Sequence, residues 1–114
     1  MGLFDSLRRK RKGGGGPRKA SDTDTDHLDS WAAERHGVEA YLEPRTNVTE
    51  TTVVLIAHDG EWTRRRIASP DAAQQFGRKR GIPVYEVRKV GYPQRMRDYT
   101  ERQRIRRRRA REQE

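Results

Sequence analysis

The order of secondary structure is set by residues 51–90, which read TTVVLIAHDGEWTRRRIASPDAAQQFGRKRGIPVYEVRKV. Positions 51–58 are rich in β-branched residues and predict a strand. The Asp59-Gly60 pair that follows is typical of a two-residue type I′ hairpin turn, in which both central residues need a positive φ. We therefore predict a β-hairpin whose returning strand covers 61–67.

The same stretch continues with a helix and another strand. Ser69 is a good N-cap, Pro70 suits the first helical position, and Gly81 is placed to end the helix in a Schellman motif. The residues that follow, 83–90, contain three valines and a tyrosine and predict a strand. Passing from strand 61–67 through this helix makes the two strands parallel, with a right-handed connection if they share one sheet.

Weaker patterns flank this stretch. A short helix is predicted to begin with Asp26 as N-cap and to end at Gly37. Residues 38–43 alternate in part and precede a proline, which favours an edge strand or the end of a strand. A last helix is predicted from Pro93, with an apolar face that ends at Tyr99. The predicted fold class is α+β, with a small mixed sheet of about four strands around a central hairpin and helices mainly on one face.

The chain has 114 residues, which is enough for one domain. Apolar residues concentrate in 27–99, and we expect this part to form the compact domain. Residues 1–26 are basic and rich in glycine, and we expect them to be disordered because they cannot offset their own ordering entropy. Residues 100–114 are predicted to form an arginine-rich helical tail.

The net charge is +9, and the excess of positive charge lies at the two ends of the chain. Residues 92–114 alone hold nine arginines against four acids. The chain has no cysteine, which excludes disulfides, thiolate metal sites and thiol catalysis. Its longest apolar run, 53–57, is far too short to cross a bilayer as a helix, and we expect a cytoplasmic protein.

An arginine cluster near the end of the chain is the strongest functional pattern. The predicted nucleic-acid-binding residues there are Arg102, Arg104, Arg106, Arg107, Arg108, Arg109 and Arg111. A continuous run of arginines covers every side of a helix, so packing against a core does not explain it. Arginine-rich arms that become ordered on RNA are a known mode of binding. The alternative is a tail that only increases solubility.

A second predicted nucleic-acid-binding group lies on the hairpin. A type I′ turn would place Trp62, Arg64 and Arg66 opposite Ala57, Leu55 and Val53. If helices cover the other face of the sheet, Trp62 points outward between two arginines, as in surfaces that stack bases and bind phosphates. The alternative is that Trp62 covers the core and that the arginines are merely solvated.

These observations favour a non-catalytic nucleic-acid-binding accessory protein, associated with RNA or the ribosome. The alternative is a protein-interaction or membrane-surface adaptor, in which the acidic segment 21–36 masks basic ends that also suit an anionic membrane. A small enzyme ranks third, because His27, His36 and His58 lack metal-ligand spacing and no catalytic or cofactor motif is found. We predict no cofactor, no metal and no small-molecule substrate, and the oligomeric state is open.

Three segments together resemble a known group of proteins. Residues 52–66, 81–87 and 91–99 are similar to a family of short uncharacterised basic proteins from high-GC Gram-positive (actinobacterial) bacteria. The resemblance covers about half of the chain. It implies a bacterial cytoplasm and no mechanism.

Overall fold

Eight helices and strands make up the described part of the chain. The computed structural model describes residues 21–113. In chain order the elements are α2 (Asp22–Ala33), β1 (Glu39–Glu43), β2 (Thr52–Ile56), β3 (Trp62–Arg66), α3 (Pro70–Arg80), β4 (Val84–Glu86), α4 (Val87–Val90) and α5 (Gln94–Glu112).

The four strands form one mixed sheet in the order β3-β2-β1-β4. The β1–β2 and β2–β3 pairs are antiparallel, and the β1–β4 pair is parallel. The predicted α+β class with a mixed four-stranded sheet is therefore confirmed. Strands β3 and β4 run parallel as predicted, but two other strands separate them. The prediction of an edge position for residues 38–43 was wrong, since β4 pairs with the outer side of β1.

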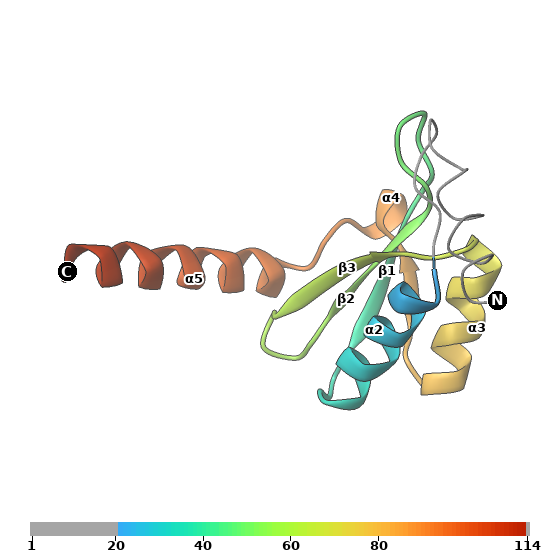
Figure 1. Cartoon of the computed structure of the whole chain (residues 1–114), viewed down its shortest axis with the longest axis horizontal. Helices are drawn as coiled ribbons and strands as arrows, with labels where there is room; N and C mark the ends of the chain where they lie inside the picture. Colours follow the sequence, from blue (N-terminus) through green and yellow to red (C-terminus); the bar gives the residue numbers. More distant parts are fainter. Residues whose placement is uncertain (1–20, 114) are drawn as a thin grey trace, which may run out of the picture.

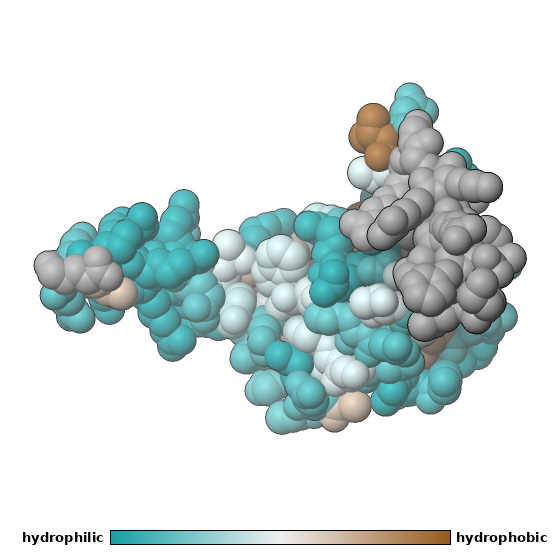
Figure 2. Space-filling view, viewed as in Figure 1, coloured by the Kyte–Doolittle hydropathy of each residue, from teal (hydrophilic) through white to brown (hydrophobic). Residues whose placement is uncertain are grey.

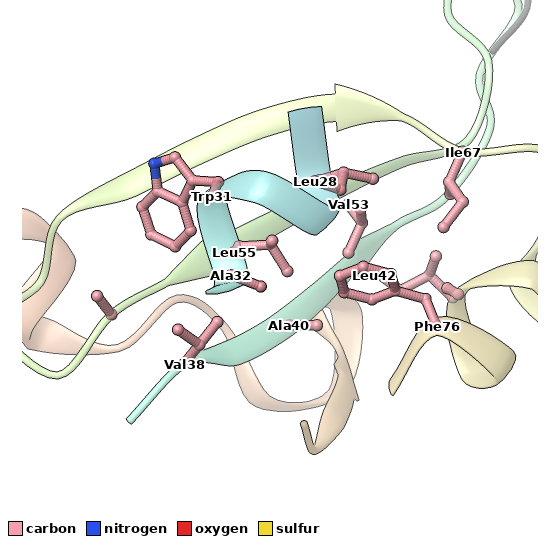
Figure 3. Packing of buried hydrophobic residues seen from close by; sticks show 12 residues of the cluster. Leu28, Trp31, Ala32, Val38, Ala40, Leu42, Val53, Leu55, Ile67 and Phe76 are labelled. Atoms are coloured by element: carbon pink, nitrogen blue, oxygen red, sulfur yellow. The ribbon is translucent and has the colours of Figure 1, made fainter. Parts of the chain in front are cut away.

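Helices α2 and α3 cover one face of the sheet (Figure 1). Their apolar side chains meet those of the strands in the larger of two buried clusters, shown in Figure 3. Leu28 and Trp31 come from α2 and Phe76 from α3, and they pack over Val53 and Leu55 of β2. Both β2 residues are fully buried, so this cluster is the main hydrophobic core.

The other face of the sheet carries a smaller cluster. Alternation along the strands directs Val54 and Ile56 to this side, where they join Tyr41 and Met96. Met96 belongs to α5, so the beginning of α5 covers this face. Helices thus lie mainly on one face, as predicted, and the second face is closed by part of one more helix.

Helix α2 begins earlier than predicted. Ser21, rather than Asp26, is its N-cap, and the helix includes residues 22–26. The Ser21 hydroxyl accepts a hydrogen bond from the Asp24 N–H, while the Asp24 carboxylate accepts from the Ser21 N–H. This reciprocal capping box satisfies two unpaired backbone donors at once and outweighs the competing cap at Asp26. The expected disorder of 1–26 was therefore wrong for its last residues, and residues 1–20 lie outside the described part.

Replacing Ser21 by alanine is expected to lower the free energy of unfolding by about 1 kcal/mol, because the Asp24 N–H loses its acceptor. Urea denaturation followed by circular dichroism measures this change. Ser30→Ala is the matched control, since Ser30 is exposed in the middle of the same helix. An equal loss of stability in both variants would show that the cap contributes nothing.

Helix α3 has the predicted ends. Ser69 caps its first turn, and Gly81 ends it in the left-handed region with φ of 68°. The Ile82 N–H donates to the Gly77 carbonyl over 2.8 Å, which is the long hydrogen bond of a Schellman motif.

The β2–β3 hairpin has a different turn from the one predicted. The Gly60 N–H donates to the Ala57 carbonyl over 3.0 Å, and the Ala57 N–H donates to the Glu61 carbonyl over 2.8 Å. Gly60 has φ of 94°, whereas Asp59 has no positive φ. These bonds define a three-residue loop with a glycine bulge, not a type I′ turn.

The longer loop moves the strand pairing by one residue. Trp62 pairs with Ile56 and Arg64 with Val54, not with Ala57 and Leu55. Because side chains alternate between faces, Trp62 lies on the face that α5 covers.

The strand predicted at 83–90 is only three residues long. Val84–Glu86 pair with Ala40–Leu42, and the chain then forms the single turn α4. Pro44 follows the end of β1 and cannot donate a ladder hydrogen bond, so no partner remains for a longer β4. No helix in residues 21–113 has the length and apolar character needed to cross a bilayer.

Candidate nucleic-acid interface

Helix α5 leaves the domain and extends into solvent. It has 19 residues, which correspond to a length of about 28 Å. Figure 1 shows its first turns beside the sheet and its remaining turns projecting away from the other elements. Residues 106–113 are all exposed, and Figure 2 shows hydrophilic colours over this projecting part.

Two arginines anchor the beginning of α5 to the hairpin loop. The Arg95 guanidinium donates to the Ala57 carbonyl over 3.0 Å. The Arg102 guanidinium donates to the Asp59 carbonyl over 2.9 Å and lies 5.8 Å from the centre of the Tyr99 ring. Arg102, a predicted binding residue, therefore also fixes the helix to the domain.

The other predicted residues of the tail come together on the projecting turns. Arg104 forms an ion pair with Glu101 within the helix. The remaining arginines are Arg106, Arg107, Arg108, Arg109 and Arg111. Within the described residues, none of these five has an ion pair with an acid. The tail thus presents a dense, exposed group of positive charges.

Trp62 does not stand outward as a free stacking surface. Its side chain is half-buried against the smaller cluster, and its indole N–H donates to the Thr100 hydroxyl over 3.1 Å. The Arg64 guanidinium lies 5.4 Å from the centre of the indole ring. The indole therefore joins β3 to α5.

Arg64 is held by an acid on β1. Its guanidinium donates to both carboxylate oxygens of Glu43, over 2.8 and 3.0 Å. Glu43 also accepts hydrogen bonds from the hydroxyls of Thr52 and Tyr92. Burial of the carboxylate would raise the pKa of Glu43, but the hydrogen bonds from Arg64, Tyr92 and Thr52 together outweigh burial and lower it.

Arg66 lies at the end of β3 and forms an ion pair with Asp24 of α2, with a distance of 3.5 Å. The predicted group of Trp62, Arg64 and Arg66 is thus distributed over three sets of contacts, to α5, β1 and α2. The structure does not bring these residues together with the arginine tail as one continuous surface.

A second group of polar residues was not predicted from the sequence. The rings of His36 and His58 are stacked, with centroids 4.2 Å apart, beside a cleft of about 680 Å³. Three arginines also line the cleft, but each forms an ion pair with an acid: Arg35 with Glu61, Arg80 with Asp29 and Arg95 with Glu39. Among residues 21–113 no group of three potential ligands could hold a metal ion. The two histidines are 22 positions apart, so no local pattern could have revealed the pair.

Comparisons of the chain with models of protein families, with curated proteins and with solved structures found no match in any of the three. The resemblance to proteins of high-GC Gram-positive bacteria therefore stays a prediction.

Proposed function

We propose that this chain is a non-catalytic nucleic-acid-binding accessory protein that binds RNA, free or in the ribosome, through the projecting part of α5. The observation that carries the proposal is the set of exposed arginines on a helix that is anchored at one end only. This function places the protein in the cytoplasm.

The spacing of these charges suits a polyphosphate. Residues 106–111 hold five arginines. With a rise of about 1.5 Å per residue they carry one charge per roughly 1.8 Å of helix, close to the charge spacing of a nucleic-acid duplex. Arginines one turn apart repel each other in the free helix. Phosphates that neutralise them remove this repulsion, so the free energy of binding includes stabilisation of the helix itself.

The domain supplies a rigid base for the helix. Trp62, Arg95 and Arg102 tie the first turns of α5 to β3 and to the hairpin loop. The projecting turns consequently leave the domain at a fixed position, and the charges reach a partner without a clash between that partner and the sheet.

Neutralising the five arginines of residues 106–111 with glutamine is expected to weaken RNA binding steeply at low salt. Each lost phosphate contact should reduce the log–log dependence of affinity on salt by about 0.7 for a single strand. Fluorescence anisotropy with a labelled single-stranded RNA, titrated at several salt concentrations, measures both effects.

The matched control is Arg78→Gln with Lys79→Gln, which removes two exposed cations from the end of α3. We expect this control to bind RNA almost as the parent does. An absence of RNA binding at low salt, or equal binding by the tail variant, would contradict the proposal. Binding of the parent to anionic vesicles but not to RNA would favour the membrane-surface adaptor instead.

A further inference from the structure

We propose that an unpaired base of single-stranded RNA enters a groove where α5 leaves the sheet, while one row of arginines along α5 binds the adjoining phosphates. This inference rests on the proposed function and assigns a second contact to the same ligand. The root groove has a volume of about 470 Å³ and is lined by Tyr92, Met96, Arg97, Thr100, Glu101, Arg104 and Arg107.

The inner part of the root groove is apolar and firmly held. Met96 is buried, and Tyr92 packs beside it on the smaller cluster. The Tyr92 hydroxyl donates to Glu43, which fixes the position of the phenol. Burial and the hydrogen bond to Glu43 raise the pKa of Tyr92, so the hydroxyl stays protonated and keeps donating. A fixed aromatic ring beside a methionine is a surface on which any of the bases can stack.

The arginines of α5 divide into two sets on opposite sides of the helix. Successive residues turn by about 100°, so positions three, four and seven apart share a side. The side that contains the root groove carries Arg97, Arg104, Arg107, Arg108 and Arg111. The opposite side carries Arg102, Arg106 and Arg109. The first set forms a row that begins at the groove and runs for roughly 21 Å toward the end of the helix.

The charge of the groove also favours a phosphate-bearing ligand. Three arginines line it against one acid, Glu101, which is paired with Arg104. A base bound between Tyr92 and Met96 has its own phosphates on either side, within the row of arginines. A duplex cannot make this contact, because its bases are stacked and paired and its major groove is too deep and narrow for side chains to reach them.

The first test compares three labelled RNAs with the full chain by fluorescence anisotropy. They are a short single strand, the same strand with abasic sites, and a hairpin duplex of equal charge. The abasic strand and the duplex are expected to bind about tenfold more weakly than the normal strand, because they offer no base to stack. The salt dependence should be the same for the normal and abasic strands, since both carry the same phosphates.

Two pairs of variants test the assignment of sides and of the ring. Arg97→Gln with Arg107→Gln should weaken binding of the normal strand more than Arg106→Gln with Arg109→Gln, although each removes two charges. Tyr92→Leu should remove the preference for the normal over the abasic strand. Tyr92→Phe loses the same hydrogen bond to Glu43 but keeps the ring, and it should retain the preference. Thermal unfolding verifies that each variant is folded.

The possible failures are distinguishable. If the full chain binds no RNA at low salt, the proposed function itself is wrong. If it binds normal and abasic strands equally, or if Tyr92→Leu keeps the preference, the RNA-binding function stands and the base-binding groove is overturned.

Discussion

Replacement of Gly60 by alanine is expected to lower the free energy of unfolding by about 2–5 kcal/mol. Gly60 has φ of 94°, in a region that residues with a Cβ rarely adopt. A Cβ at this position would lie 2.0 Å from the carbonyl oxygen of Arg95 in the backbone of α5. The cost combines backbone strain of about 1–3 kcal/mol with overpacking of similar size. Urea denaturation followed by circular dichroism measures the loss.

Gly81→Ala is the control that separates strain from contact. Gly81 has a similar φ of 68°, but a Cβ there would meet nothing within 4 Å. We expect this variant to lose only about 1–2 kcal/mol, from the left-handed backbone alone. Equal losses in the two variants would contradict the close packing of the hairpin loop against α5.

Replacement of Glu43 by glutamine is expected to lower the free energy of unfolding at pH 7 by about 1–3 kcal/mol, the usual cost of a disrupted charged hydrogen-bond group. The Glu43 side chain is 16% exposed and the Arg64 side chain 44% exposed. Arg64 can therefore regain water when it loses its partner, which limits the loss. Glu61→Gln is a useful comparison, because its partner Arg35 lies at another edge of the domain.

The same variant should change the response of stability to acid. The pKa of Glu43 is lower in the folded protein than its ordinary value of 4.5. Its stabilising contribution is therefore fully present above about pH 4.5 and is lost as the pH falls through the folded pKa. Between neutral pH and pH 3 the parent should lose more stability than Glu43→Gln, measured as the melting temperature at each pH. Parallel curves for the two proteins would show that this carboxylate is not stabilised by folding.

The elements predicted correctly are those whose determinants lie close together in the sequence. Ser69 and Gly81 specify both ends of α3 through hydrogen bonds to their near neighbours. The start of α2 was missed because Ser21 and Asp26 are both acceptable caps, and only the capping box with Asp24 decides between them.

Errors in the sheet arose where distant partners decide the structure. An Asp-Gly pair fits more than one tight turn, and here the loop also has to fit against the backbone of α5. The central position of β1 depends on pairing with β4, which follows it by more than 40 residues. Neither fact leaves a pattern in the local sequence.

The candidate site divides in the same way. The arginine tail was predictable because a run of like charges has no role in packing. The contacts of Trp62 with Thr100 and of Arg64 with Glu43 join residues that are 38 and 21 positions apart. Tyr92 and Met96 were expected on one face of the last helix, but the groove beside them forms only when that helix leaves the sheet.

The pairing of β1 with β4 has a consequence for the kinetics of folding. The β1–β2 and β2–β3 pairs close short loops, such as the one between Ile56 and Trp62, whereas Tyr41 meets Tyr85 only after α3 has been crossed. Closing the longer loop costs more entropy and delays the contact. Strand β4 and α5 therefore add to a three-stranded meander that is already formed. Interactions made after the transition state slow unfolding and leave the folding rate unchanged. Changes where α5 meets the sheet consequently set the lifetime of the native state, and changes within the meander set the speed at which the chain reaches it.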